Sequence, residues 1–278
     1  NILWYLYLHR SLPESLSTYL IFAQNLAWEH PSFFPEAWSL SVEEYFYLLF
    51  PIIIGLLTAT KMRPATAFLT AGTVLLLFST TLRFVFAPQE SITWDAGIRK
   101  VVLFRLDALM YGIYLSYFID KIKFFKIQKP LFAIGLSALA ASLSAYFIFD
   151  HDSSFFLKTL EFSMTSLGFM LIIPHMMDLK LAEPTGVGRF FKKTALWSYS
   201  MYLSNFLIYN MIQALVFLKY FNNHPAYGAL LCIPLLLGAT YLISALVYRI
   251  FEFPIMNFRE NAIVWLNKYF SPLKEITR

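Results

Sequence analysis

The chain has 278 residues, of which 58% are hydrophobic, 19% aromatic and only 14% charged. Soluble domains are about 45–50% apolar and about 25% charged, so the composition predicts an integral membrane protein and excludes a water-soluble domain. The net charge of +5 comes from short loops between apolar segments, not from a basic face interleaved with aromatic rings, so nucleic acid is not an expected partner. The single cysteine, Cys232, provides neither an internal disulfide nor a metal set.

The apolar segments predict an all-α polytopic transmembrane helix bundle with about seven full spans and one or two partial N-terminal helices. We expect the partial helices at 1–8 and 14–28. The full spans, each near the roughly 20 residues that cross a bilayer, are predicted at 39–60, 65–86, 98–119, 130–149, 155–174, 195–218 and 226–251. Residues 1–257 then form the transmembrane domain, and 258–278 form a short amphipathic tail at the membrane interface.

The charges of the loops predict the orientation of the spans. Loops at 61–64, 120–129 and 175–194 and the tail from 249 carry 15 of the 22 basic residues. The opposite loops, PQESITWDAG, DHDSS and YFNNHPA, are acidic or neutral. By the positive-inside rule the basic set is cytoplasmic. We therefore expect a multi-pass protein of the cell inner membrane whose C-terminus is cytoplasmic and whose span from 39 starts at the outer side.

Few ionisable residues remain at membrane depth, and each is a functional candidate because burying a charge there costs roughly 2.5–3.5 kcal/mol. They are Glu43, Glu44, Arg83, Arg105, Asp107 and Glu161. Arg105 and Asp107 are two residues apart and do not face each other on a helix, so each needs a partner elsewhere or a ligand. Arg105 suits either a clamp for a phosphate or carboxylate or an ion pair between helices. Glu161 lies in a Ser- and Thr-rich stretch, which favours a structural role.

The stretch PEAWSLSVEEYFYLLFP places two adjacent acids at the outer start of a span. One interpretation is a capping box, in which Ser41 caps the helix and Glu44 follows three residues later, with both acids favoured by the positive end of the helix dipole. However, Glu43 and Glu44 point about 100° apart on a helix, so one cap cannot use both. We expect one of these acids to pair with Arg83 or Arg105.

The two faces of this helix suggest a ligand. One face carries Ser39, Glu43, Phe46 and Phe50, and the other carries Trp38, Ser41 and Tyr45. A polar and aromatic entrance of this kind suits a ligand that bears hydroxyl groups, such as a sugar.

At this point the sequence resembles a known family. WSLSVEEYFYLLFP at 38–51 resembles the signature of the acyltransferase 3 family of membrane O-acyltransferases. FRLDALMYG (104–112), SYSMYLSN (198–205) and YRIFEFPIMNFR (248–259) resemble further family motifs in the same order, and YLIFAQNL (19–26) matches the stretch before the signature. The first motif is specific and the others are individually weak, but together they cover nearly the whole chain.

The resemblance implies a bundle of about ten helices that moves an acyl group, usually acetyl, from cytoplasmic acyl-CoA to a hydroxyl of a glycan or lipid-linked sugar. It implies no cofactor beyond the acyl-CoA donor. Glu43 and Glu44 would belong to the acceptor side, and Arg105 to a polar lining that holds a donor or an acid. Tyr199 and Glu252 would shape the bundle around that lining. The predicted catalytic residues are Glu43, Glu44 and Arg105. The predicted substrate-binding residues are Trp38, Ser41, Tyr45, Arg83, Asp107 and Tyr199, and no metal ligand is expected.

Two departures from the family pattern stand out. The family's catalytic histidine lies on its first helix, ten residues after a basic residue, and no histidine here has that spacing. Asn205 stands where many relatives carry histidine. We therefore expect an N-terminally truncated member, whose catalytic base lies on a segment outside this sequence. The alternatives are a transporter or flippase of a lipid-linked sugar, for which no inverted repeat or matched pair of broken helices is visible, and a non-catalytic relative.

Overall fold

The computed structural model describes residue 5 and residues 16–119, 124–177, 185–221 and 225–270. Within these residues every regular element is helical and none is a strand, which confirms the all-α prediction. The chain divides into two compact units, residues 1–180 and 181–278.

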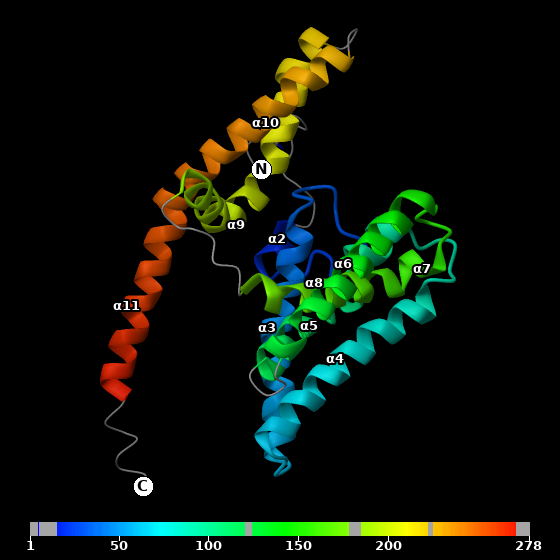
Figure 1. Cartoon of the computed structure of the whole chain (residues 1–278), viewed down its shortest axis with the longest axis vertical. Coiled ribbons are helices and arrows are strands. Elements are labelled where there is room, and N and C mark those ends of the chain that lie inside the picture. The colour runs from blue at the N-terminus through cyan, green and yellow to red at the C-terminus, as the bar shows by residue number, and fades with distance from the viewer. Residues whose placement is uncertain (1–4, 6–15, 120–123, 178–184, 222–224, 271–278) are drawn as a thin grey trace. The chain divides into compact units, whose positions relative to one another are not determined.

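The first unit holds the longer run of elements (Figure 1). Its α-helices are α2 (Leu16–Leu20), α3 (Ala37–Ala59), α4 (Pro64–Phe86), α5 (Ala108–Phe118), α6 (Phe124–Ile148), α7 (Phe155–Lys158) and α8 (Leu160–Met177). Between α4 and α5 lie a short π-helix, η1 (Trp94–Arg99), and a 3₁₀ turn, η2 (Val102–Phe104). Helices α6 and α8 pack closely together. The helix predicted at 14–28 is much shorter than expected, and the one predicted at 1–8 lies outside the described residues except for Tyr5.

Six described helices are long and apolar enough to cross a membrane: α3, α4, most of α6, α8, residues 186–218 and residues 226–264. Six of the predicted spans are therefore confirmed in length and composition. The span predicted at 98–119 is wrong as a single helix, because α5 has only 11 residues and η1 and η2 precede it.

Backbone hydrogen bonds explain why the helix breaks before α5. The N–H of Val102 donates to the carbonyl of Asn25 at 2.9 Å, and the N–H of Leu103 donates to that of Leu26 at 3.2 Å. These groups are therefore paired with a distant segment instead of with a preceding helical turn. Irregular backbone is tolerated at membrane depth only where protein or a cavity satisfies it. The break places Arg105 and Asp107 in a non-helical turn at the start of α5.

The core of this unit lies between α3, α4 and the broken segment. Val42, Phe46 and Phe50 recur every four residues on one stripe of α3, and all three are buried. Their partners in the cluster are Ala71, Leu75, Val102, Leu106 and Met110. The periodic apolar stripe thus fixes the side of α3 that faces the protein, and with it the directions of the neighbouring glutamates.

The second unit consists of α9 (Gly186–Ile212), the π-helix η3 (Gln213–Phe221), α10 (Pro225–Val247), η4 (Tyr248–Glu252) and α11 (Phe253–Phe270). Helices α9 and α10 pack together. Figure 1 shows α10 continuing into α11 as one rod, whereas we expected the last span to end near 251. The backbone of η4 and Phe253 stays helical up to Pro254, so this proline does not end the rod.

Candidate functional site

The most buried charges of the first unit form one ion pair. Arg83 lies in the last turn of α4 and Asp107 directly before α5, and both side chains are almost completely buried. Nη1 of Arg83 donates to Oδ1 of Asp107 at 2.8 Å, and Nη2 donates to Oδ2 at 2.6 Å. This two-pronged geometry is the strong form of a charge-assisted hydrogen bond.

The remaining donors of Arg83 hold three segments together. Its Nε donates to the carbonyl of Thr159 at 3.1 Å, and Nη1 also donates to the carbonyl of Phe104 at 2.5 Å. Nη2 donates to the hydroxyl of Ser163 at 2.9 Å. All three nitrogens thus have protein partners, a geometry that favours a structural role. The predicted pairing of Arg83 with Glu43 or Glu44 is wrong, because Asp107 takes that place; substrate binding by Arg83 and Asp107 stays a prediction.

Arg105 differs from Arg83. In the part of the chain that the structure describes, its buried Nε and Nη1 have no hydrogen-bond partner, and no ion pair joins it to an acid. Its guanidinium lies 4.2 Å from the centre of the Phe162 ring and 5.9 Å from that of Trp38. The two aromatic rings attract the cation but accept no in-plane hydrogen bond. A buried guanidinium with free donors is able to bind an anionic or carbonyl oxygen.

Two aromatic residues link this arginine to the loop after α4. Trp38, in the first turn of α3, lies under Arg105 and also 5.3 Å from the guanidinium of Arg99. Phe162, in the first turn of α8, lies under Arg105 and 6.1 Å from Trp94 in a stacked arrangement. The charged residues and their aromatic neighbours therefore gather at one end of the helices, where α3 and α8 begin and α4 ends.

The two glutamates have different surroundings. Glu43 is partly buried beside the apolar stripe of α3, whereas Glu44 is exposed. The capping-box interpretation is wrong, because α3 begins at Ala37 and makes no side-chain cap, so Ser41 lies inside the helix. No ion pair joins either glutamate to an arginine within the described ranges. Their assignment to the acceptor side remains a prediction, and of the two Glu43 is the better sheltered.

The structure places the other predicted residues as follows. Ser41 is buried and accepts a hydrogen bond from Nε2 of Gln24 at 2.6 Å, and Tyr45 packs against the core as a partly buried side chain. Tyr199 lies in α9 of the second unit and is 49% exposed. Near it in the chain, Ser200 donates to Oε2 of Glu252 at 2.7 Å, an interaction that ties α9 to η4.

Glu161 has hydrogen-bond partners in the protein, as the expected structural role requires, but only one of them is local. Its Oε1 accepts hydrogen bonds from the hydroxyl of Ser142 at 2.6 Å and from that of Thr165 at 2.8 Å. Ser142 lies on α6, so the acid fastens α6 to α8.

Sequence reasoning gave no role to Gln24 and Asn25, which are both buried. Nδ2 of Asn25 donates to the carbonyls of Trp38 at 3.2 Å and Lys100 at 2.5 Å. Within the described residues, Oε1 of Gln24 and Oδ1 of Asn25 have no partner. Two adjacent amides in the apolar stretch YLIFAQNL are the signal that could have identified them, because a buried amide needs hydrogen-bond partners.

The loops beside this cluster carry their own charges. Asp95 forms ion pairs with Arg99 and with Lys100, the latter at 2.6 Å. Burial alone would raise the pKa of Asp95, but the hydrogen bonds and charges of Lys100 and Arg99 lower it below its usual value. Burial lowers the pKa of His30 to about 4, against a hydrogen bond to the carbonyl of Pro31 that opposes the shift. His30 is therefore neutral at physiological pH.

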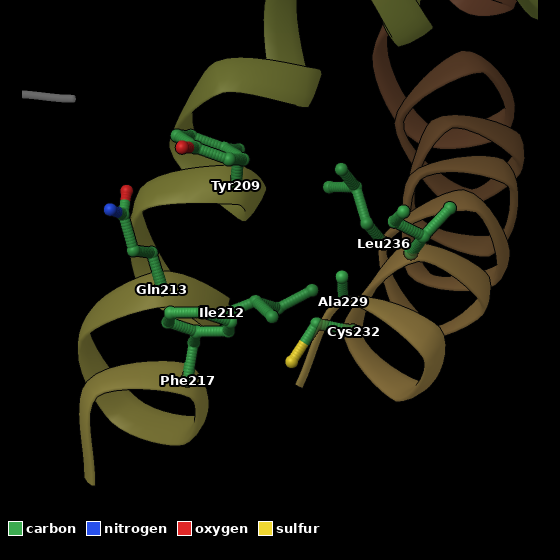
Figure 2. Close-up of a pocket in the computed structure, with 8 residues that line it drawn as sticks. Tyr209, Ile212, Gln213, Phe217, Ala229, Cys232 and Leu236 are labelled. Atoms are coloured by element: carbon green, nitrogen blue, oxygen red, sulfur yellow. The ribbon is translucent and has the colours of Figure 1, made fainter. Parts of the chain in front are cut away.

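The second unit contains an apolar cavity of about 200 Å³ between α9–η3 and α10. Figure 2 shows Tyr209, Gln213 and Phe217 on one wall and Cys232 and Leu236 on the other. No charged side chain lines this cavity, so it resembles a packing gap between helices. Over the described ranges, no group of three or more His, Cys, Asp or Glu side chains is arranged to hold a metal ion.

The comparison with known families agrees with this arrangement. A family model described as an acyltransferase domain, that of the acyltransferase 3 family, matches residues 1–249. The match covers most of the chain, so the protein belongs to the acyltransferase 3 family of membrane acyltransferases. No protein of curated function and no solved structure matches the chain significantly. The family implies an acyl donor and an acceptor that meet in a membrane.

Proposed function

We propose that the protein transfers an acyl group, acetyl in the first instance, from acyl-CoA to a hydroxyl of a glycan or lipid-linked sugar. One observation carries this proposal: the buried Nε and Nη1 of Arg105 have no hydrogen-bond partner in the described part of the chain. Trp38 contacts this arginine and lies five residues before Glu43, about 7.5 Å along the axis of α3. The acid thus lies on the helix whose first turn contacts the cation.

In this mechanism the acceptor hydroxyl attacks the carbonyl carbon of the thioester. A C–O bond forms, the C–S bond breaks, and CoA leaves as a thiol with the proton of the hydroxyl. Negative charge develops on the carbonyl oxygen during the attack, and preorganised donors stabilise such charge. Arg105 supplies these donors, and Glu43 accepts a hydrogen bond from the acceptor hydroxyl. Trp38 and Tyr45 provide aromatic surface for the sugar, and Ser41 orients α3 through Gln24.

The position of the charges supports this assignment of roles. Trp38, Arg83 and Phe162 lie in terminal helical turns, at the end that the loop charges assign to the outer side of the inner membrane. We therefore assign Arg105 to the reacting carbonyl, and not to the phosphates of cytoplasmic CoA.

The test uses the full-length protein in lipid nanodiscs with acetyl-CoA and an extract of the host's lipid-linked sugars. Free CoA thiol and acetylated product are measured together. The wild type should form both, and the double variant E43Q/E44Q should form neither while it inserts normally. Unchanged product formation by that variant would exclude a role for the acids. In sealed vesicles, movement of the sugar without CoA release would favour a transporter or flippase, and neither activity would favour a non-catalytic relative.

A further inference from the structure

A second, polar cavity lies beside the charged cluster in the first unit. Its volume is about 740 Å³, within the range of about 300–1,000 Å³ that ligand pockets occupy. The lining comes from η1, the end of α6 and the loop between α6 and α7, with Trp94, Asp95, Arg99, Tyr146, His151 and Asp152 as the principal side chains. The two loops involved, 88–97 and 150–154, are both among those that the charge distribution assigns to the outer side.

The aromatic side chains form one wall of this cavity. The ring centre of His151 lies 4.4 Å from that of Tyr146 and 5.1 Å from that of Trp94. Trp94 is fixed in place, because its Nε1 donates to the carbonyl of Leu157 at 3.1 Å and its backbone N–H donates to Oδ1 of Asp152 at 2.7 Å. Tyr146 is 39% exposed and therefore offers ring surface to a ligand.

The polar groups of the lining select the kind of ligand. The carboxylates of Asp95 and Asp152 are balanced by Arg99 in the lining and by Lys100, which pairs with Asp95, so a neutral ligand is favoured. Nε2 of His151 is buried and has no hydrogen-bond partner among the described residues, so it is a polar atom left for a ligand. A neutral pyranose fits this combination, because its hydroxyls both donate and accept hydrogen bonds and its C–H face packs on aromatic rings.

The cavity is connected to Arg105 through shared aromatic rings. Trp94 stacks on Phe162, which lies under Arg105. Arg99 lies over both Trp94 and Trp38, at 5.4 Å and 5.3 Å from the ring centres. Two side chains, either Trp94 and Phe162 or Arg99 and Trp38, therefore separate a ligand in the cavity from the free guanidinium.

We propose that this cavity binds a neutral pyranose unit of the acceptor on the outer side of the membrane, next to the sugar whose hydroxyl is acylated. The inference rests on the proposed acyltransferase function and specifies where its acceptor is held. Tyr146 and His151 make the direct contacts, and Trp94 forms the floor.

The test measures sugar binding separately from catalysis. Saturation-transfer difference NMR is recorded on the full-length protein in nanodiscs with four probes: the methyl glycosides of glucose, galactose, mannose and N-acetylglucosamine. At least one should receive saturation from the wild type. Tyr146→Ala and His151→Ala should each weaken its binding roughly tenfold, as truncation of a residue in direct contact with a ligand does. Tyr209→Ala, which removes a tyrosine from the apolar cavity of the second unit, should bind like the wild type.

Absence of saturation for all four glycosides, or equal binding by the wild type, Tyr146→Ala and His151→Ala, would overturn the inference. A thermal melt of each variant shows whether it is folded, and His151→Ala and Tyr146→Ala test the site independently. The acetyl-CoA assay separates the two proposals. Sugar binding without acetyl transfer would support the sugar site and refute the proposed transferase function. Acetyl transfer with the same acceptor KM in Tyr146→Ala as in the wild type would support the transferase function. It would refute the proposal that this cavity binds the acceptor.

Discussion

Arg83 and Asp107 are joined by two parallel hydrogen bonds of 2.8 Å and 2.6 Å, although 24 residues and a broken helix separate them in the chain. The pair fastens the end of α4 to the start of α5, and Ser163 adds α8 through its hydrogen bonds to both residues. The adjacent Arg105 is thereby left without the acid that stands two residues from it.

Removal of one member of this pair should destabilise the protein strongly. D107N leaves the buried charge of Arg83 uncompensated, and such losses cost about 3–5 kcal/mol. The matched control is D95N, which breaks ion pairs on a half-exposed aspartate and should cost at most about 1 kcal/mol. Thermal unfolding in detergent measures both. The double variant R83M/D107L, which replaces the pair by apolar side chains, should recover much of the stability that D107N loses. A D107N protein as stable as D95N would contradict this account.

Helices α6 and α8 approach closely at two glycines. A Cβ added to Gly135 would lie 2.7 Å from the carbonyl oxygen of Gly168, and small residues at such contacts allow helices to approach in membranes. G135A should therefore lower the unfolding free energy by about 1–3 kcal/mol. Gly112 has no atom within 4 Å of its added Cβ, so G112A should be neutral or slightly stabilising. Equal melting temperatures for the two variants would show that the contact is not tight.

Stability should depend on pH through His30, whose folded pKa is about 4 because of burial. The unfolded chain binds a proton near pH 6.5, so between these values the unfolded state holds more protons and stability falls as the pH falls. The H30Q variant should show a flatter decrease between pH 6.5 and 4. Melting temperatures measured across this interval test the prediction, and identical slopes would contradict it.

The two glutamates should differ in importance. Glu43 is partly buried beside the core of α3 and Glu44 is exposed, so only Glu43 is sheltered enough to act on an acceptor in a low-dielectric site. E43Q should reduce acetyl transfer about 10²-fold, whereas E44Q should leave it close to that of the wild type. A larger effect of E44Q would place the acceptor on the face of α3 that carries Glu44.

The sequence predicts the helices better than it predicts their partners. The apolar lengths give six spans, because a bilayer requires about 20 apolar residues whatever the fold. The break before α5 was not predictable, since it depends on Asn25 and Leu26 accepting hydrogen bonds from Val102 and Leu103, a long-range pairing that no local pattern indicates. The continuation of α10 into α11 was missed because the amphipathic stretch after the last span was interpreted as a tail at the membrane interface.

The same limit applies to the site. The pattern at 38–51 identified the helix that carries Glu43 and Trp38, and the local Thr165 accounts for one of the two partners of Glu161. The ion pair could not be assigned, because Arg83, Arg105, Asp107, Glu43 and Glu44 allow several pairings and only tertiary packing selects one. The buried amides of Gln24 and Asn25 were visible in the sequence, but their role as a link between α3 and the broken segment is a tertiary fact.

The most direct measurement is acetyl transfer by the R105Q variant. Wild type, R105Q and the exposed control R189Q are reconstituted in nanodiscs, and kcat is determined from free CoA and acetylated product. Loss of the free guanidinium should lower kcat about 10²–10³-fold. The kcat of R189Q and the melting temperatures of both variants should stay close to the values of the wild type. An R105Q enzyme with the kcat of the wild type would show that this arginine does not stabilise the transfer, and the account of the site would be wrong.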